Sequence, residues 1–326
     1  MKPRALLICP EFFGYQDDIA AELQKAGFDV TSIDERPSDQ QLVRGIIRIR
    51  PTLLRSAIEW HYKNALKKFA HHRFDLVIVV KAEVVPRWFI EALRSRNPSA
   101  KFVLYVFDSR ANFPQAHGLT DLFDSCFTFD PQDSMVSSDW NYLPLFYTSE
   151  FRARGDRKRR WEAAFVGTLH SDRYQFVQSL MSDTNNNYCH LYINAWWLFA
   201  YLKYVTGEQR EVPWRALSTR KLSREETADV FRQSKAVLDM QRPYQSGLTM
   251  RTFEVLASGA ILVTTNQHVR EASFYDPERV LVVHPGDGRV GARMVRDRLE
   301  CTEAFDGPPS GFSQYGLRAW IQRLIA

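Results

Sequence analysis

The stretch QSGLTMRTFEVLASGAILVTTN, residues Gln245 to Asn266, contains a polar lead-in, a helix and a strand in immediate succession. Its second half predicts a helix, TFEVLASG, that ends at Gly259 and is followed at once by a short buried strand, AILVTTN. Its first half carries a glycine, hydroxyl side chains and Arg251, which a buried core does not need. We infer that a ligand lies against the start of this helix.

The first half of the chain alternates in the same way between strand-length apolar runs and helical patterns. The strand-like runs are ALLICP, FDVTSIDE, DLVIVVKAE, KFVLYVFDS and CFTFDP, with YLPLFY as one more strand at the end of this half. The helical patterns are DDIAAELQKAG, the segment 52–72 and PRWFIEALRSRNP. Repeated strand and helix predict a parallel sheet with helices on both faces.

A charged run, TSEFRARGDRKRRW, separates the halves, and the alternation resumes after it. The later strands are EAAFVGTLH, YCHLYIN, AVLDMQ and RVLVVH; the later helices are SDRYQFVQSLMS, AWWLFAYLKYV and SREETADVFRQS, the last opened by a capping box of Ser223 and Glu226. We expect WWLF, residues 196–199, to pack in the core or between domains.

The fold class predicted from this pattern is α/β, with two doubly wound, Rossmann-like domains that face a cleft. We expect an N-terminal domain at residues 1–150 and a C-terminal domain at 151–310. Residues 311–326 would form a closing helix that packs back on the N-terminal domain.

Composition excludes several classes of protein. With 326 residues, 45% hydrophobic and 25% charged, the chain fits a globular protein of two domains. Four scattered cysteines without CxxC spacing favour a reducing cytosolic compartment and argue against a structural metal. The run ALLICP is too short for a signal sequence, and no stretch approaches the ~18 apolar residues of a membrane span. We expect a cytoplasmic protein.

The net charge of +5 indicates an anionic partner or a solvated basic surface. Basic residues gather in RARGDRKRR, residues 152–160, and in the segment 44–73, where they alternate with apolar residues. The basic members of 44–73 are Arg44, Arg48, Arg50, Arg55, Lys63, Lys67, Lys68 and Arg73. This segment is either a solvated helix face or a basic amphipathic helix. The second alternative predicts contact with an anionic membrane, on its inner face, or with a lipid-linked or phosphorylated saccharide.

In open α/β sheets, ligands bind beyond the carboxyl ends of the strands, so the polar lead-in is a candidate site. Gly247 lets the backbone approach a ligand, and Thr249 would cap the helix, whose free N–H groups suit a phosphate. Arg251 adds a planar fork for the same oxygens, and Glu254 could accept hydrogen bonds from a ribose. The same residues also fit a structural interpretation, with Thr249 and Glu254 stabilising the helix start and Arg251 solvated.

The segment GLTMRTFEVLASGAILVTTN resembles the nucleotide-sugar-binding segment of group-1-type glycosyltransferases of the GT-B fold. In that family a glutamate begins the helix, a small-residue AxG ends it and a strand follows. The resemblance implies that Glu254 binds the donor ribose and that the loop before it binds the diphosphate. The commoner pattern has a second glutamate eight positions earlier, where this chain has Ser246, so the retaining outcome usual for that pattern is not carried over.

The resemblance extends to other parts of the chain. FVGTLHSDR, residues 165–173, resembles the first strand and loop of the donor domain, which implies that Gly167 and Thr168 lie against the pyrophosphate and Arg173 near it. Ser171 and Asp172 would start the next helix. LVIVVKAE, LYVFDS, FTFDPQD and YLPLFY resemble the acceptor half of a lipopolysaccharide- and CgeB-type branch of these enzymes.

The donor-binding residues that we predict combine these segments. Arg242 follows a predicted strand directly, whereas Arg220 and Lys221 could equally be ordinary surface cations, and His170 either touches the sugar or phosphate or is structural. The full set is Gly167, Thr168, His170, Arg173, Arg242, Gly247, Leu248, Thr249, Arg251, Thr252 and Glu254.

A carboxylate at a strand end of the N-terminal half could accept a proton from an acceptor hydroxyl, the general-base role that inverting sugar transfer needs. Asp108 is our first candidate, Glu83 the second and Glu11 the third. Each could instead be a helix cap or part of an ion pair, and Lys81 and Glu83 could simply neutralise each other.

These observations predict a glycosyltransferase that moves a sugar from a nucleoside diphosphate sugar to a glycan or lipid-linked saccharide, in bacterial surface polysaccharide or glycoconjugate synthesis. The helix start with Arg251 or Arg242 would stabilise the departing diphosphate, so we expect neither a metal nor a cofactor besides the donor substrate. A nicotinamide-dependent oxidoreductase needs a GxGxxG turn, and PEFFGYQDD has one glycine. A nucleic-acid-binding protein should show a recognised module, and none is found, so we expect no nucleic acid partner.

Overall fold

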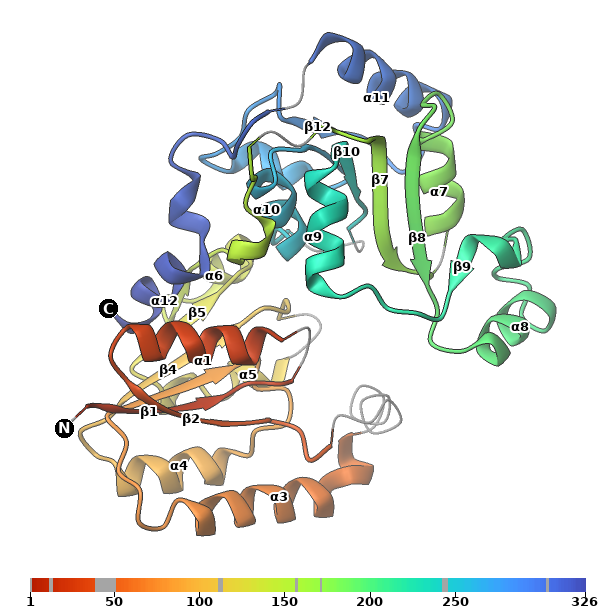
Figure 1. The fold of residues 1–326 in the computed structure, drawn as a ribbon. Coiled ribbons are helices and arrows are strands. Elements are labelled where there is room, and N and C mark those ends of the chain that lie inside the picture. Colours follow the sequence, from red (N-terminus) through yellow and green to blue (C-terminus); the bar gives the residue numbers. More distant parts are fainter. Residues whose placement is uncertain are drawn as a thin grey trace. The chain divides into compact units, whose positions relative to one another are not determined.

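The computed structural model divides the chain into two compact units (Figure 1). It describes residues 2–11, 14–38, 51–110, 114–155, 158–170, 172–241, 246–302 and 305–326. The first unit comprises Met1–Leu145 and Leu317–Ala326, and the second comprises Phe146–Gly316. Among the described residues, no helix combines the length and the apolar character needed to cross a membrane.

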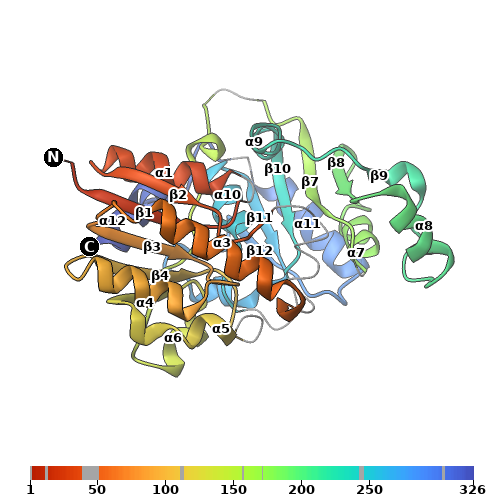
Figure 2. The same cartoon turned by 90° about the horizontal axis from the view of Figure 1, so that it is seen from below.

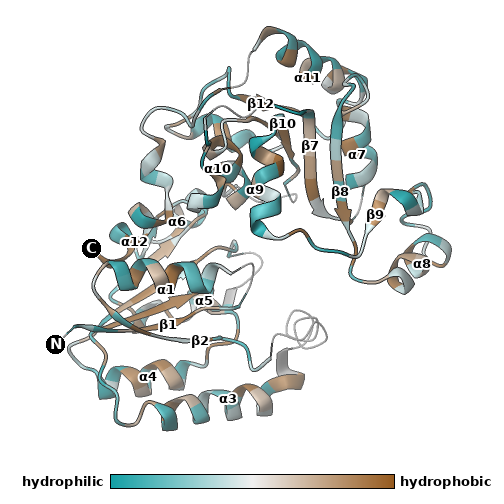
Figure 3. Cartoon of the chain, viewed as in Figure 1, coloured by the Kyte–Doolittle hydropathy of each residue, from teal (hydrophilic) through white to brown (hydrophobic). Residues whose placement is uncertain are grey.

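The first unit contains a six-stranded sheet with the strand order β2-β1-β3-β4-β5-β6, and every neighbouring pair is parallel. Its strands are β1 (Arg4–Ile8), β2 (Asp29–Ile33), β3 (Leu76–Val80), β4 (Lys101–Val106), β5 (Ser125–Thr128) and β6 (Trp140–Tyr142). All five residues of β3 are buried because helices cover both faces of the sheet, which explains its continuous apolar sequence. Figure 3 shows this apolar character along β1 as well.

Two layers of helices cover the first sheet (Figures 1 and 2). The helices are α1 (Tyr15–Lys25), α3 (Arg55–Lys68, preceded by η1, Pro51–Leu54), α4 (Arg87–Arg96), α5 (Pro114–His117), η2 (Thr120–Leu122), α6 (Pro131–Val136) and α12 (Leu317–Ile325). Tyr62 of α3 and Phe89 of α4 pack in one buried cluster with Phe102 and Leu104 of β4. On the other face, the ring of Tyr105 contacts that of Trp320 in α12 with centroids 4.7 Å apart.

The second unit contains another fully parallel sheet, with the order β12-β11-β10-β7-β8-β9. Its strands are β7 (Trp161–Thr168), β8 (Asn187–Tyr192), β9 (Leu217–Ser218), β10 (Ser234–Asp239), β11 (Ile261–Thr264) and β12 (Val280–Val282). Its helices are η3 (Ser149–Phe151), α7 (Arg173–Leu180), α8 (Trp196–Tyr204), η4 (Trp214–Ala216), α9 (Arg224–Arg232), α10 (Met250–Ala257), η5 (Gln267–Glu271), α11 (Arg289–Cys301) and η6 (Phe312–Tyr315). The capping box of α9 is confirmed, since Ser223 Oγ accepts from Glu226 N at 3.1 Å and Glu226 Oε2 from Ser223 N at 2.7 Å.

Three expectations about elements were wrong. The last strand of the first sheet is β6, whereas YLPLFY contributes only Tyr142 to it, because Pro144 has no N–H for a sheet hydrogen bond. The end of the chain does not form one helix over 311–326. Residues 312–315 form η6, whose Phe312 stacks on Tyr147 of the same unit at 5.6 Å, and the helix proper begins at Leu317.

The third wrong expectation concerns the segment WWLF, residues 196–199. Phe199 is 1% exposed and is a core residue, but Trp196 and Trp197 are 42% and 74% exposed. The helix α11 and the short strand β9 had no counterpart among the predicted elements. The α11 sequence, RVGARMVRDRLEC, has few apolar residues, and only Gly291, Ala292 and Val295 of it are buried.

The turn from α10 into β11 requires a glycine at position 259, as the sequence indicates. Gly259 has a φ of +73°, and a Cβ atom there would lie 2.5 Å from the carbonyl oxygen of Phe305 and 2.8 Å from Arg159 Nη2. That guanidinium group donates to the carbonyls of Ser258 and Phe305, at 3.0 and 2.8 Å, so it is held in place.

We predict that Gly259→Ala lowers the free energy of unfolding by more than the ~1–2 kcal/mol that the left-handed conformation alone costs, because the new methyl group also displaces Arg159 and Phe305. Gly207→Ala is the matched control, since Gly207 has a φ of +75° and open space around it. Urea unfolding of both variants measures the difference. Equal losses in the two variants would show that the contact with Phe305 is relaxed at no cost.

Candidate functional site

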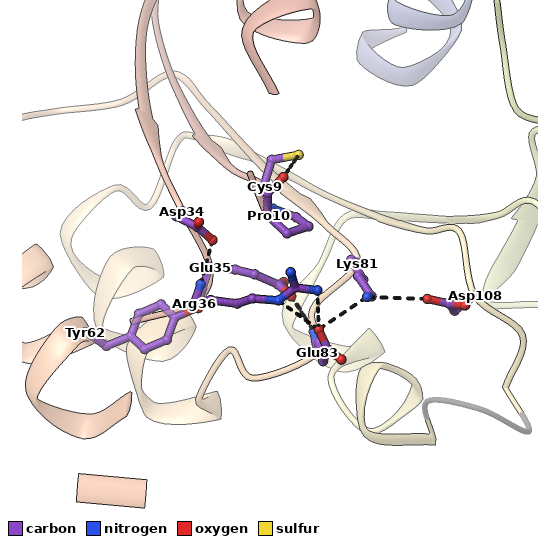
Figure 4. Close-up of polar contacts among 9 residues, drawn as sticks. All are labelled: Cys9, Pro10, Asp34, Glu35, Arg36, Tyr62, Lys81, Glu83 and Asp108. Atoms are coloured by element: carbon purple, nitrogen blue, oxygen red, sulfur yellow. Dashed lines mark hydrogen bonds and ion pairs between the residues drawn. The ribbon is translucent and has the colours of Figure 1, made fainter. Parts of the chain in front are cut away.

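Charged side chains gather where three strands of the first sheet end (Figure 4). Glu35 and Arg36 follow β2, Lys81 and Glu83 follow β3, and Asp108 follows β4. The strand β1 lies between β2 and β3, so the chain reverses its direction of winding here, and such a switch point is where ligands of open α/β sheets bind.

Glu83 is the centre of this charged cluster. Its Oε2 accepts hydrogen bonds from Arg36 Nη2 at 2.7 Å and Nε at 3.1 Å, and it lies 3.2 Å from Lys81 Nζ. The same Nζ lies 3.6 Å from Asp108 Oδ2, so Lys81 connects the two preferred candidates for a general base. The ion pair between Lys81 and Glu83 that the sequence left as an alternative is therefore present.

Glu35 supports the loop that follows β3 through hydrogen bonds to its backbone. Its side chain is fully buried, and both of its carboxylate oxygens lie 3.2 Å from the backbone N of Glu83, which donates to them. Burial, together with the negative charge of Glu83, raises the pKa of Glu35 to about 8, against the opposing effects of Lys81 and Arg36. The sequence analysis missed Glu35 and Arg36, although their place directly after the run FDVTSID is the same signal that identified Glu83.

The backbone of this loop is strained. Lys81 has a φ of +82° and Ala82 of +55°, and they are the only non-glycine residues with positive φ in the part of the chain that the structure describes. Hydrogen bonds fix the conformation on both sides, from Lys81 N to the carbonyl of Tyr105 at 2.7 Å and from Glu83 N to Glu35. Such conformations cost about 1–3 kcal/mol each and gather at functional sites.

The electrostatics distinguish the three base candidates. Burial alone would raise the pKa of Glu83, but Lys81 and Arg36 outweigh it and lower that pKa. A carboxylate that is so stabilised as an anion is a weaker base. The Asp108 side chain is 29% exposed and lies 3.6 Å from Lys81 Nζ, so it is more accessible to an acceptor than the buried Glu83 and is the better placed candidate. Glu11 is exposed after β1, and no contact with this cluster is found for it among the described residues.

The second sheet has its own switch point, between β7 and β10, and Arg173 spans it. Its Nη1 donates to the carbonyl of Thr168 at the end of β7, at 2.8 Å, and its Nη2 donates to the carbonyl of Met240 after β10, at 3.3 Å. Arg173 is only 8% exposed. Gly167 gives the Phe165 ring its space, because a Cβ there would lie 2.7 Å from that ring.

Asp239, the last residue of β10, organises the polar lead-in to α10. It is 3% exposed, and its Oδ2 accepts from the hydroxyls of Thr249 at 2.8 Å and Thr252 at 3.3 Å. Thr249 occupies the N-cap position, as expected, but makes no side-chain cap hydrogen bond. Its hydroxyl donates a hydrogen bond to Asp239 instead. The sequence analysis missed this role of Asp239, which stands at the end of the strand-like run AVLDMQ.

Arg251 lies beside the same carboxylate, with Nη1 3.9 Å from Asp239 Oδ1. Its guanidinium carbon is 5.6 Å from the centroid of the Phe165 ring, and that of Arg173 is 5.7 Å from the same centroid. Two guanidinium groups are thus placed around one ring. The Nε of Arg251 is buried, and no described residue accepts its hydrogen bond.

Glu254 and the loop before α10 are buried as well. Glu254 is 7% exposed and is the fifth residue of α10, about one turn beyond the N-cap Thr249. Leu248 and Ser246 are 5% and 3% exposed. Asn266 Nδ2 donates to the carbonyls of Ser246 and Gly247, at 3.3 and 3.5 Å, and so ties the loop to the end of β11.

The structure brings together most of the predicted donor residues around Phe165 and Asp239, namely Gly167, Thr168, Arg173, Thr249, Arg251 and Thr252. His170 is half-buried, and its carbonyl accepts from Arg173 N at 3.3 Å. Arg220 is paired with Glu226 at 2.6 Å, and Lys221 Nζ lies 5.2 Å from the ring centroid of Tyr192. Arg242, Ser171 and residues 44–50 lie outside the described residues. Within the described ranges, no group of three or more His, Cys, Asp or Glu could hold a metal ion.

Comparison with known proteins gives one family match. The model of the family described as "Glycosyl transferase-like" matches residues 173–300, which is less than half of the chain but includes α7, β10 and α10. No curated protein matches the sequence.

Several solved structures share the fold over the whole chain. HepE (Alr3699) of Anabaena, solved with UDP and glucose, has a TM-score of 0.66 and 11% identity, covering 100% of this chain and 98% of that one. AviGT4, a glycosyltransferase involved in avilamycin A biosynthesis, has a TM-score of 0.61 and 14% identity, with 100% and 96% covered. The UDP-GlcNAc 2-epimerase of Methanocaldococcus jannaschii, solved with UDP-GlcNAc and UDP, has a TM-score of 0.57 and 9% identity, with 100% and 98% covered.

These similarities confirm the predicted fold class, an α/β protein with two Rossmann-like domains of the GT-B type. At such low identity they establish the fold alone, and the same fold serves a transferase and an epimerase. The family match and the fold together support a glycosyltransferase.

The raised pKa of Glu35 generates a prediction for stability against pH. The folded protein keeps a proton on Glu35 that the unfolded chain releases above pH 4.5, so this group makes stability fall as pH rises from about 4.5 to about 8. The slope amounts to about 1.4 kcal/mol per pH unit at most. Glu35→Gln should remove this slope and raise stability at pH 8 relative to the unsubstituted chain.

Urea unfolding between pH 5 and pH 8 checks this expectation, with the difference between the two proteins plotted against pH. Glu91→Gln, at an exposed glutamate of the same unit, is the control and should leave the slope unchanged. A slope that persists in Glu35→Gln would show that Glu35 is ionised in the folded protein.

Proposed function

We propose that this chain is a glycosyltransferase that takes its sugar from a nucleoside diphosphate sugar bound at the switch point of the second sheet. The observation that carries the proposal is the arrangement of Arg173, Arg251 and the α10 start around Phe165 and Asp239. The match of residues 173–300 to the glycosyl transferase-like family supports it.

The chemistry of this site suits a diphosphate. Two guanidinium groups near one ring repel each other, and an anion between them would relieve that repulsion. The hydroxyl of Thr249 donates to Asp239, so the first N–H groups of α10 have no side-chain cap. Such a helix start attracts phosphate. Glu254, one turn further along α10, would accept from the ribose hydroxyls.

The same groups would assist departure of the leaving group. As the bond to the sugar breaks, negative charge develops on the diphosphate, and Arg251 and the helix start would stabilise it. Positive charge supplied in this way replaces the role that a divalent metal has in other transferases, so we propose a metal-independent reaction.

In the first unit, Asp108 would accept the proton of the attacking hydroxyl. Lys81 holds its carboxylate in place at 3.6 Å, while Arg36 and Glu35 fix the neighbouring Glu83. We propose that the acceptor is a glycan or a lipid-linked saccharide, and that the product belongs to a bacterial surface polysaccharide or glycoconjugate, as the resemblance of the N-terminal half to the lipopolysaccharide- and CgeB-type branch implies. Within the basic segment 44–73, Lys63 of α3 is exposed, and its Nζ lies 3.7 Å from Glu59 Oε2.

Nucleotide binding tests the donor site. Isothermal titration with UDP, GDP, ADP and CDP should identify one preferred nucleotide, and Arg251→Ala and Glu254→Gln should each weaken it by roughly 10- to 100-fold, because each removes a charge-assisted hydrogen bond worth ~1.5–3 kcal/mol. Arg270→Ala, at an exposed arginine of η5, is the matched control and should bind normally. Binding of none of the four, or equal binding by all variants, would contradict the proposal.

Turnover tests the general base and separates a transferase from an epimerase. With the preferred nucleotide sugar, Asp108→Asn should lower kcat for sugar transfer or donor hydrolysis by about 10²–10⁴, with little change in the KM for the donor, because proton removal and not donor binding is lost. Glu11→Gln serves as the control, because Glu11 follows β1, which β3 separates from β4. Nuclear magnetic resonance of the products identifies the sugar, and an epimerised nucleotide sugar as the main product would reject transfer.

A further inference from the structure

Helix α8 exposes its aromatic side chains instead of burying them. Trp197, Tyr201, Tyr204 and Val205 are 74%, 51%, 69% and 69% exposed. Their spacing, i, i+4, i+7 and i+8, places them on one face of the helix. Phe199, on the opposite face, is 1% exposed and belongs to the core of the second unit. α8 is therefore apolar on its exposed face as well as on the face that meets the core, unlike an ordinary surface helix, whose exposed face is polar.

This aromatic face is fixed in shape. Phe199 packs edge-on against Trp214 of η4, with centroids 4.7 Å apart, and Trp196 lies 5.6 Å from the same ring. Trp214 Nε1 donates to the hydroxyl of Tyr204 at 3.3 Å, and Lys203 Nζ donates to the carbonyl of Val212 at 2.9 Å. Trp196 and Trp214 are themselves 42% and 39% exposed, so they extend the face. Large contiguous apolar surfaces of this kind on soluble proteins mark interaction sites.

The surroundings of the aromatic face are basic. Between residues 196 and 221 the chain has five basic side chains, Lys203, Arg210, Arg215, Arg220 and Lys221, and two acidic ones, Glu208 and Glu211. Arg220 is neutralised by its ion pair with Glu226, which leaves four cations against two carboxylates. Arg210 and Arg215 are exposed. In Figure 1, α8 lies beyond the edge strand β9, away from α7 and α11. The face is therefore accessible in the second unit.

We infer that α8 and η4 form a membrane-binding surface, whose occupant is the headgroup region of an anionic lipid bilayer. Trp and Tyr have an apolar body and a polar edge, and they concentrate where hydrocarbon meets water. Cations beside them are attracted to anionic headgroups. A short helix with this composition lies in the plane of the interface and does not span the bilayer. A neutral glycan would gain nothing from the basic surroundings.

This inference concerns a surface distinct from the donor site and from the basic segment 44–73, and it does not depend on the proposed transfer reaction. The test uses co-sedimentation of the full chain with vesicles of phosphatidylcholine alone or mixed with phosphatidylglycerol. We expect binding to the mixed vesicles, and the triple variant Trp197→Ser, Tyr201→Ser and Val205→Ser should weaken it by at least about tenfold. All three positions are exposed, so the thermal melting curve should be unchanged.

Two further variants determine which residues of the chain cause binding to the vesicles. Arg210→Glu with Arg215→Glu should weaken binding to mixed vesicles only, and less so at high salt. Leu53→Ser with Trp60→Ser removes two side chains of similar exposure, 70% and 68%, at η1 and α3, and should leave vesicle binding intact. The inference is overturned if the chain binds no vesicles, if binding survives the α8 triple variant, or if it is lost only in the Leu53 and Trp60 variant.

Discussion

The structure depends on one constraint, the parallel arrangement of every strand in both sheets. Each strand must be followed by a crossover that returns the chain to the opposite end, so all carboxyl ends of a sheet lie at one edge. Residues that are far apart in the sequence, such as Glu35, Glu83 and Asp108, therefore meet at that edge. In a central strand such as β3, covering helices leave room only for apolar side chains, so the polar groups of the site lie at the strand ends.

At both switch points, a buried carboxylate organises a loop instead of facing a ligand. Glu35 accepts the backbone N–H of Glu83 and holds a strained turn, while Asp239 accepts the hydroxyls of Thr249 and Thr252 before α10. A buried acceptor of this kind is expensive to leave unsatisfied, so it fixes its partners more firmly than a surface group does. The two loops differ in charge, because the first is neutralised by Lys81 and Arg36 and the second is bordered by arginines.

This difference in charge agrees with the different roles that we propose for the two units. The first unit offers a partly exposed carboxylate, Asp108, beside an ion-paired network, which suits proton removal from an acceptor. The second offers cationic groups and a helix start, which suit a diphosphate. The aromatic face of α8 adds a third property, since its basic surroundings and its exposed rings match a lipid surface and not a protein interior.

The sequence by itself determined the alternation of strands and helices, the fold class, the turn at Gly259 and the capping box of α9, because each follows from local periodicity or backbone conformation. It also predicted Arg173, Arg251 and Asp108 as site residues, from their places in loops and at a helix start that follow strands. Only the tertiary structure decided what these groups contact: that Thr249 serves Asp239, that Arg173 spans β7 and β10, and that Glu35 supports Glu83. It also showed that the aromatic side chains of α8 face outward, since apolar composition and helical spacing are the same whichever face meets the core. Burial and partner choice depend on residues distant in the chain, and local pattern carries no information about them.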